Sequence, residues 1–433
     1  MHSQMTNKEG DQRAAALQKG FLQVFLRFRA FQALRYRDYR LIWYGQTFVS
    51  LGTWMDEVTR GWLIYELTNS AVQLGLVRGI QAIPFLLLSP VAGSVADRYS
   101  RKTQLIVSQV VNGLVFAATA LLIFSGRIRP WHVYVTAFLM ALVQTFQQPA
   151  RAAMVSDSVP KEFLINAIGL NSTMFNMARS TGPALAGVLI ALAGTGGSYA
   201  VQALFYFLAT FWTVQLRPLQ RPARSAGGQS APAESFGRSI VEGWKFSWNN
   251  EAVRTGLIAA TIASLFIAPF TTLLPVFARD LLKIGATGQG LLLTAMGIGA
   301  LLSSFLIASS GDKLPRGMLM LGSVAVYGFT LVFFAASVWY HLSLILMVIA
   351  GLCHVHSHSL VQTVIQSYSP PEFRGRTMSL FYMSRVLTTL GSTLVGVLSA
   401  VVGARWALAS MCLVGALSML MIYAAMPRAR LIR

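Results

Sequence analysis

The stretch GSVADRYSRK, Gly93 to Lys102, decides the fold, because it is a charged turn between two long apolar segments. Each flanking segment holds about 20 mostly apolar residues, enough to cross the hydrocarbon of a bilayer. Of the 433 residues, 55% are hydrophobic and 12% are charged. A soluble protein of this size carries roughly twice that charged fraction. We therefore predict an all-α polytopic membrane protein.

Twelve apolar windows predict twelve transmembrane helices in two six-helix bundles. The first 38 residues are polar and basic, and lack the apolar stretch and cleavage site of a signal peptide. Residues 217–238 are rich in Pro, Gly, Ser and Arg, which predicts a flexible linker between the bundles. The predicted domains are a cytoplasmic basic segment (1–38), an N-terminal bundle (39–216), a cytoplasmic linker (217–250), a C-terminal bundle (251–426) and a cytoplasmic tail (427–433). The windows lie roughly at 41–67, 71–96, 103–125, 131–155, 164–193, 197–216, 252–280, 286–310, 317–338, 341–366, 376–402 and 404–426.

Lysine and arginine are distributed unequally over the two sides of the predicted membrane. The side with both termini and the linker carries 26 of the 35, the opposite side carries five, and four lie within spans. By the positive-inside rule, both termini lie in the cytoplasm of a bacterial-type inner membrane. The net charge of +20 is thus an orientation signal and not a nucleic-acid footprint. The segment Arg27–Arg40 either lies on the anionic leaflet as an amphipathic helix or is a tail that only fixes orientation.

Two sets of loop residues recur across the linker, at shifts of 215 and 210 positions. Weak parallel repeats of six spans indicate a transporter whose site lies between its halves. The first set matches Asp97, Arg98 and Arg101 with Asp312, Lys313 and Arg316, and the second matches Pro160, Glu162 and Phe163 with Pro370, Glu372 and Phe373.

The charged turn follows the pattern G-x-x-x-D-R-x-x-R-K, with Gly93, Asp97, Arg98, Arg101 and Lys102 at its positions. A glycine allows close helix approach, and an aspartate at a span end pairs with the positive N-terminus of a neighbouring helix. The pattern resembles the signature loop of the major facilitator superfamily, in which the loop is a latch that favours the outward-facing state. The alternative interpretation is an ordinary positive-inside loop.

The fifth span resembles the antiporter signature of the same superfamily, G-x8-G-x3-G-P-x2-G-G, with two glycines replaced by alanine. Ala178, Gly182 and Ala186 share one helix face, so another helix can pack closely there, and Pro183 would bend the span. The resemblance implies an exporter, whereas the small residues alone also fit plain helix packing. The matched positions are Gly169, Ala178, Gly182, Pro183, Ala186 and Gly187.

Three longer stretches resemble the proton-linked drug and siderophore exporters, the branch that includes macrolide efflux proteins and the enterobactin exporter. The resemblance covers nearly the whole chain after about residue 30, and it is specific to a family and not to a substrate. The stretches are Leu51–Val77, Gln147–Ser172 and Ser369–Leu380.

Two carboxylates, Asp56 and Glu57, are the only ones within a span. A carboxylate in hydrocarbon costs about 2.5–3.5 kcal/mol, so it usually faces a cavity and serves a function. Because successive residues turn by about 100°, Arg60 falls between the two, which predicts a compact cluster of charge −1. Desolvation and crowding favour the protonated form of one carboxylate, and this predicts proton coupling. A static salt bridge near the outer interface is the alternative.

Three further arginines, Arg78, Arg179 and Arg385, lie within the second, fifth and eleventh spans. An intramembrane arginine should face a wet cavity or a carboxylate. These residues therefore favour a cavity for anionic or zwitterionic substrates, unless they snorkel or pair with Asp56 or Glu57.

The tenth span contains CHVHSHS, in which His354 and His358 share a helix face and His356 points nearly opposite. Such histidines can line a cavity and titrate, bind substrate, hold a metal or simply pack. No third ligand or HExxH context is evident, so we expect no metal and no cofactor.

No P-loop and no nucleophile–histidine–acid set is present, and we predict a non-enzyme. The first hypothesis is a secondary active transporter that exports small amphipathic molecules, of the drug or siderophore class, by proton antiport and alternating access. The second is a lipid or lysolipid flippase or uniporter of the same fold, and the third is a non-transporting membrane sensor or assembly partner. The expected partners are a small-molecule substrate, protons and membrane lipids, with no nucleic acid, and the chain is expected to be a monomer.

Overall fold

The computed structural model describes residues 29–217, 236–310, 316–426 and 430, and these ranges are helical apart from short connections. The expected tail, most of the basic N-terminal segment and most of the linker lie outside them. The N-terminal half contains η1 (Arg29–Arg35), α2 (Arg37–Thr68), α3 (Ala71–Arg98), α4 (Arg101–Phe124), α5 (Pro130–Asp157), η2 (Lys161–Phe163) and α6 (Leu164–Val214). The C-terminal half contains α7 (Phe236–Asn249), α8 (Glu251–Ile262), η3 (Ala263–Ile267), α9 (Phe270–Val276), η4 (Phe277–Leu281), α10 (Gly285–Ser310), α11 (Arg316–Ala336), α12 (Tyr340–Ser367), α13 (Pro371–Val402) and α14 (Ala404–Ala425).

Helix α6 contains two spans. At Gly194 the backbone has φ 68° and ψ −178°, a conformation that favours glycine, and the chain reverses there. The fifth and sixth spans therefore follow one another directly. In the C-terminal half, by contrast, α8, η3, α9 and η4 together form one span, from Glu251 to Leu281.

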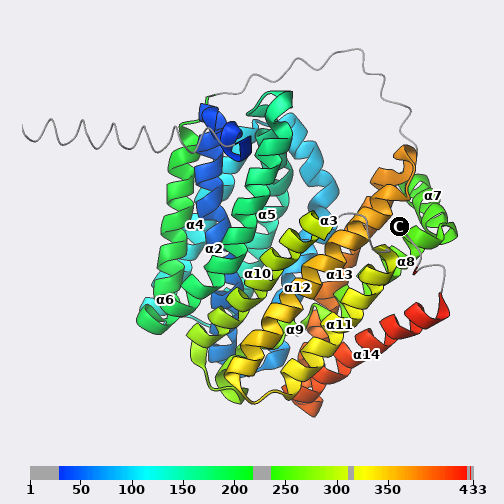
Figure 1. The fold of residues 1–433 in the computed structure, drawn as a ribbon. Coiled ribbons are helices and arrows are strands. Elements are labelled where there is room, and N and C mark those ends of the chain that lie inside the picture. Colours follow the sequence, from blue (N-terminus) through cyan, green and yellow to red (C-terminus); the bar gives the residue numbers. More distant parts are fainter. Residues whose placement is uncertain (1–28, 218–235, 311–315, 427–429, 431–433) are drawn as a thin grey trace, which may run out of the picture.

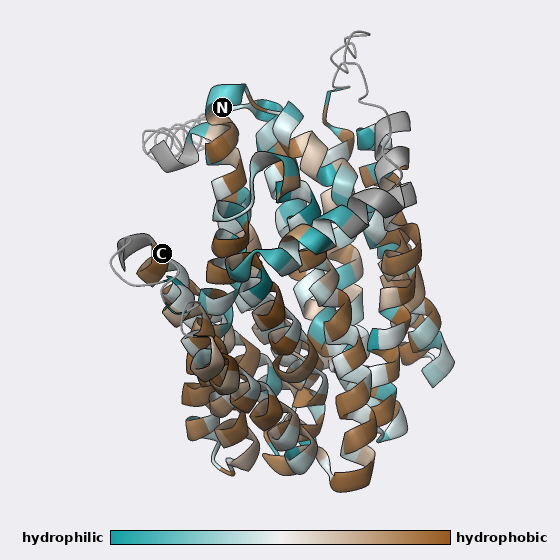
Figure 2. Cartoon of the chain, turned by 90° about the vertical axis from the view of Figure 1, so that its right-hand side faces the viewer, coloured by the Kyte–Doolittle hydropathy of each residue, from teal (hydrophilic) through white to brown (hydrophobic). Residues whose placement is uncertain are grey.

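Each half therefore has six spans, because α6 supplies two spans in the N-terminal half and Glu251–Leu281 is a single span in the C-terminal half. Among the described residues, nine helical stretches are long and apolar enough to cross a membrane by composition alone, and the stretch that contains α6 counts twice. Helices α2 and α5, of 32 and 28 residues, are also long enough, but polar residues lower their hydropathy. The predicted all-α fold of twelve membrane-spanning helices is confirmed. Figure 2 shows hydrophobic residues along most of the helix length and hydrophilic residues gathered towards the end at which the described chain begins.

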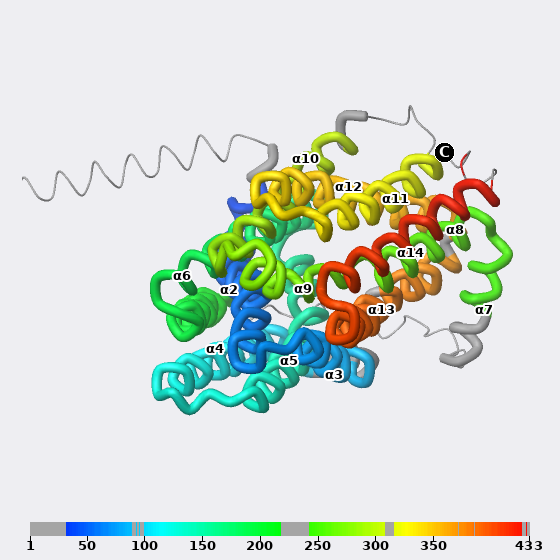
Figure 3. The backbone as a smooth tube through the Cα atoms, turned by 90° about the horizontal axis from the view of Figure 1, so that it is seen from below, coloured from blue at the N-terminus to red at the C-terminus, as the bar shows by residue number. Residues whose placement is uncertain are grey.

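The two halves meet along two helix pairs, α3 with α13 and α6 with α10, and lie side by side in Figures 1 and 3. Glycines permit this approach. A Cβ at Gly75 of α3 would lie 2.7 Å from the Ser392 carbonyl oxygen, and one at Gly187 of α6 would lie 2.6 Å from the Ala286 carbonyl oxygen. The backbones of the two halves therefore touch directly.

We call the end with Arg37 and Arg217 the basic end and the end with Asn69 and Gly194 the opposite end. Polar contacts described between the halves lie towards the opposite end or midway: the Tyr65 hydroxyl donates to Asp280, and Thr393 donates to the Gly75 carbonyl oxygen at 3.4 Å. The ion pairs described at the basic end, Arg101 with Asp157 and Arg376 with Glu242, stay within one half. The halves are thus joined away from the basic end.

Both cysteines, Cys353 and Cys412, are free and buried among the helices of the C-terminal half. They lie within separate helices, α12 and α14. They act as small apolar core residues.

Candidate functional site

Asp56 and Arg60 form a buried ion pair within α2. The Asp56 carboxylate accepts hydrogen bonds from Arg60 Nε and Nη2, both at 2.9 Å. Arg60 Nη1 also donates to Thr136 Oγ1 of α5 at 3.1 Å. The two residues are 8% and 3% exposed. Because they lie one helical turn apart, the two residues form a neutral pair, which is almost fully buried.

Glu57 forms a second, more open ion pair with Arg78 of α3. Arg78 Nη1 donates to Glu57 Oε2 at 2.8 Å, and Nη2 donates to Oε1 in a closer contact. The two side chains are 28% and 27% exposed, well above the Asp56–Arg60 pair. The Glu57–Arg78 pair is therefore the more exposed of the two ion pairs.

The structure thus divides the cluster that the sequence predicts. Instead of three residues of charge −1, there are four residues in two neutral pairs. The reason is helix geometry: Asp56 and Arg60, four residues apart, lie on one face, while Glu57 lies about 100° round the helix and faces α3. Arg78 pairs with Glu57, as one of the two sequence interpretations of that arginine supposed.

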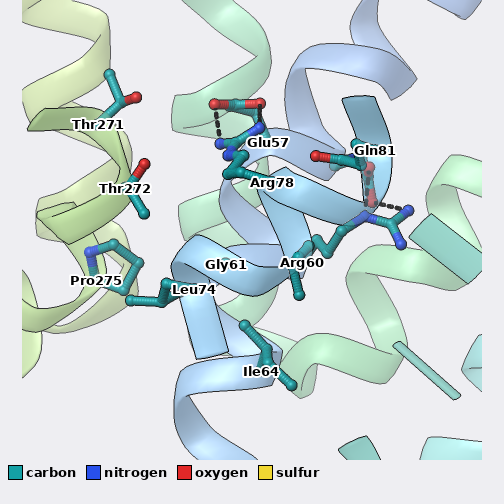
Figure 4. A pocket seen from close by; sticks show the side chains of 12 residues that line it. Glu57, Arg60, Gly61, Ile64, Leu74, Arg78, Gln81, Thr271, Thr272 and Pro275 are labelled. Carbon is teal, nitrogen blue, oxygen red and sulfur yellow. Dashed lines mark hydrogen bonds and ion pairs between the residues drawn. The ribbon is translucent and has the colours of Figure 1, made fainter. Parts of the chain in front are cut away.

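Both ion pairs, Glu57 with Arg78 and Asp56 with Arg60, line a narrow pocket between the two halves (Figure 4). Gly61, Leu74 and Gln81 line its N-terminal side, and α9 supplies the C-terminal side. The pocket is too small for an organic substrate and has room for about one or two water molecules. In this conformation the pocket therefore holds no organic molecule. The residues from α9 are Thr271, Thr272 and Pro275.

Sequence reasoning did not find the α9 residues or the contact between Tyr65 and Asp280. Apolar windows carry no information about which helix faces which. One signal was nevertheless available, because Tyr65 and Asp280 are 215 positions apart, the same shift as the repeated charged turn. Residues at equivalent positions of two repeats, such as Tyr65 and Asp280, lie close together near the pseudo-twofold axis that relates the repeats.

The charged turn is described in part. Arg101 forms an ion pair with Asp157, and Lys102 Nζ donates to the Val214 and Leu216 carbonyl oxygens, at 2.7 and 2.6 Å. Lys102 thereby binds the end of α6, where carbonyl groups lack helical partners. The side chains of Asp97 and Arg98 and the surroundings of Gly93 lie outside what the structure describes. Their latch role stays a prediction.

The small-residue face of α6 packs closely on two other helices. Ala178 and Ala186 are buried, and a Cβ at Gly182 would lie 2.7 Å from Trp54 Cβ of α2. Gly187 meets α10 as described above, and the Pro183 carbonyl oxygen would lie 2.5 Å from a Cβ at Gly290. Gly169, by contrast, has open space around its Cα. The expected close packing is observed between Ala178 and Gly187, and the antiporter role stays a prediction.

The residues expected to line a substrate cavity lie on four helices: Arg78 on α3, Arg179 on α6, His354 and His358 on α12, and Arg385 on α13. The Arg179 guanidinium lies over the Trp54 ring, 5.8 Å from its centroid. The His354 and His358 rings are 6.3 Å apart on one face of α12, next to Tyr327 and Phe381 respectively. Together these residues combine positive charge, titratable rings and aromatic surface. The side chain of Arg385, in α13, lies outside the described residues.

The described part of the chain contains no group of three or more His, Cys, Asp or Glu side chains that could hold a metal ion. His356 lies apart from the other two histidines, with its Nδ1 at 3.5 Å from Ser303 Oγ.

Comparison with known proteins identifies the family. Residues 29–431 match the model of the transmembrane secretion effector family, MFS_3. The chain belongs to this family. It is 26% identical over 362 residues to the staphyloferrin A transporter of Staphylococcus aureus, covering 82% of this chain and 87% of that one. It is 24% identical over 346 residues to the multidrug efflux pump Tap of Mycobacterium tuberculosis, covering 78% and 81%.

The fold of this transmembrane secretion effector matches solved transporters. A bacterial homologue of the human lysosomal transporter Spinster, in an inward-facing and occupied conformation, has a TM-score of 0.69 and 16% identity, covering 91% of this chain and 98% of that chain. The match supports the fold alone. This chain is accordingly a multi-pass membrane transporter of the major facilitator type, and the sequence resemblance to that superfamily and its exporter branch is confirmed.

Proposed function

We propose that this transporter exports small amphipathic molecules in exchange for protons, with its basic end in the cytoplasm. The observation that carries the proposal is the Glu57–Arg78 pair, a partly exposed ion pair in a pocket shared by both halves. Placing an ionisable pair inside the membrane costs free energy, and such residues usually serve a function. A pair at the boundary between moving halves can connect protonation with that movement.

The exchange follows from the chemistry of the pair. A proton that enters from the opposite end neutralises Glu57 and releases the Arg78 guanidinium. The hydroxyls of Thr271 and Thr272, on the facing side of the pocket, are acceptors for the released group. When Glu57 is ionised, Arg78 pairs with it inside the N-terminal half. When Glu57 is protonated, Arg78 contacts the α9 hydroxyls of the C-terminal half. When Glu57 returns its proton towards the cytoplasm, the original pair forms again.

The buried Asp56–Arg60 pair has a separate role in this proposal. Opening it would leave an uncompensated charge in the bundle, which costs several times more than opening an exposed pair. It therefore remains closed throughout the cycle and holds α2 against α5 through Thr136. Glu57 carries the proton, and Asp56 fixes the helix that presents it.

The substrate class follows from α6 and α12. Arg179 over the Trp54 ring offers a positive charge beside an aromatic surface, which suits an amphipathic molecule with an anionic group. His354 and His358 lie on the other half. Relatives that carry staphyloferrin A or several drugs are consistent with export of such compounds.

A reconstitution experiment tests the proton role. The purified chain in proteoliposomes is given a pH gradient, and efflux of staphyloferrin A is measured together with proton flux. Glu57→Gln should lower gradient-driven transport about tenfold or more while substrate exchange without a gradient persists. Glu66→Gln, an exposed carboxylate of the same helix, is the matched control and should behave like the unmodified chain. Full gradient-driven transport by Glu57→Gln would refute the proton role, and translocation of a labelled phospholipid instead of staphyloferrin A would favour a flippase.

A further inference from the structure

Helix α7 is a short helix at the basic end that precedes the first span of the C-terminal half and lies at the outer edge of the bundle (Figures 1 and 3). Sequence analysis assigned this region to the linker. Its side chains are described from Glu242 onward, and they divide into two faces. One face is fixed to α13, and the other is exposed.

The fixed face contacts the first turns of α13. Arg376 Nη1 donates to Glu242 Oε2 at 2.7 Å, and the Phe246 and Phe373 rings stack with centroids 4.6 Å apart at 13°. A Cβ at Gly243 would lie 2.8 Å from Arg376 Cβ, so the helix backbone itself rests on that side chain. An ion pair, a ring stack and a close backbone approach hold α7 in one position on α13.

The exposed face carries two tryptophans one helical turn apart. Trp244 and Trp248 are 55% and 52% exposed, and their rings are parallel at 10° with centroids 5.9 Å apart. Lys245, also exposed, lies on the same side of the helix. Tryptophan pairs next to a lysine are typical of the boundary between lipid headgroups and acyl chains, where the ring is partly apolar and the amine meets phosphate.

The internal repeat places this face at the membrane surface independently. Tyr36 contacts Phe163 with tilted rings whose centroids are 5.5 Å apart, and Phe246 contacts Phe373 with stacked rings whose centroids are 4.6 Å apart. Both residues of the second pair follow those of the first by 210 positions, the shift of the repeated loop. Residue Phe246 of α7 is therefore equivalent to Tyr36. Tyr36 directly precedes the first span, so both residues lie at the level where a span begins.

We propose that the exposed face of α7 is a docking surface for anionic phospholipid, with Trp244 and Trp248 at the acyl boundary and Lys245 at the phosphates. The occupant is the bilayer because α7 lies at the outer edge of the bundle, directly before the first span of the C-terminal half, and its exposed residues include Lys245. The proposal rests on the membrane fold and does not depend on proton exchange.

Docking at this place acts on transport through α13. The same helix meets α3 across the halves, where Thr393 donates to the Gly75 carbonyl oxygen and the two backbones touch. Lipid that binds α7 therefore fixes the basic end of α13. Further along, α13 contacts α3 of the other half. Anionic lipid should change the transport rate through this connection.

Spin labelling of the full chain in nanodiscs tests the docking. Trp248→Cys is labelled in phosphatidylcholine with and without phosphatidylglycerol, and relaxation by oxygen and by a water-soluble nickel chelate gives its depth. Leu302→Cys on the lipid side of α10 and Arg217→Cys at the basic end are the depth controls. The label at 248 should be severalfold less accessible to nickel than the label at 217, and phosphatidylglycerol should lower that accessibility further.

Several results would overturn the proposal. A label at 248 as accessible to nickel as the label at 217 would place α7 in water. Protection that arises only in discs with two copies would assign the face to a second copy of the chain. If Trp248→Cys lowers the yield of folded protein, Lys245→Cys reports on the same face. As a functional check, Trp244→Ser with Trp248→Ser should abolish the effect of phosphatidylglycerol on staphyloferrin A efflux, whereas Trp406→Ser, on an exposed tryptophan at the opposite end, should retain it.

Discussion

The first spans of the two halves occupy equivalent places in the repeat and are built differently. Helix α2 is unbroken over 32 residues and carries both intramembrane carboxylates. Its counterpart, Glu251–Leu281, is interrupted by the π-helical segments η3 and η4, with Pro269 and Pro275 between and beside them. The first span is an unbroken α-helix that carries charged residues in its middle, and the other span is apolar in its middle and interrupted by π-helical segments.

This difference indicates that the halves divide two tasks. A buried ion pair needs fixed geometry, because its hydrogen bonds must offset the loss of hydration. A span that bends needs interrupted backbone hydrogen bonds, which prolines and π-helical turns provide. The pocket lies where the two spans face each other, so charge in α2 and backbone freedom in α9 meet at one place.

The largest expected effect comes from removing the buried charge of the straight span. Arg60→Met leaves Asp56 enclosed and unpaired, and should lower the free energy of unfolding by about 3–5 kcal/mol. Thermal unfolding in detergent measures this. Asp56→Asn combined with Arg60→Met should recover much of the loss, because no charge is left behind. Equal melting of Arg60→Met and the unmodified chain would show that the pair is not a structural element.

A smaller effect on stability, but a clear one on transport, should follow from straightening the irregular span. Pro275→Ala provides a backbone N–H that can donate to the Thr271 carbonyl oxygen. It should raise the free energy of unfolding by up to about 3 kcal/mol. It should also slow efflux severalfold, since the pocket wall becomes stiffer. Pro149→Ala, within α5 and away from the pocket, is the matched control for relief of a helix-breaking proline. Equal efflux by both variants would argue against a hinge in α9.

The smallest effect is expected at the basic end. Asp157→Asn removes the ion pair with Arg101, whose side chains are about 30% exposed on both partners. Exposed pairs contribute about 0–1 kcal/mol, so the melting temperature should change by a few degrees at most. A loss as large as that of Arg60→Met would mean that charges at the basic end, and not only those within α2, hold the N-terminal half together.

The sequence was sufficient for the features that depend on hydropathy and spacing. Apolar windows located the spans, even the direct junction near Gly194, because a bilayer requires a minimum apolar length. Spacing also found the small face of α6. It could not assign partners, because Arg60 can reach either Asp56 or Glu57 on an isolated helix. The choice depends on Arg78 of α3, which takes Glu57. Helix α7 was missed because its 14 residues are too few to span a membrane and directly follow the polar linker, and only its two-sided pattern marks it.

The buried positions of Cys353 and Cys412 have a practical consequence. Neither thiol is open to water-soluble maleimides in the folded chain, so a cysteine introduced at the surface can be modified selectively without first replacing the native ones. Distances between paired probes on the two bundles can thus be followed in the unaltered background during a transport cycle.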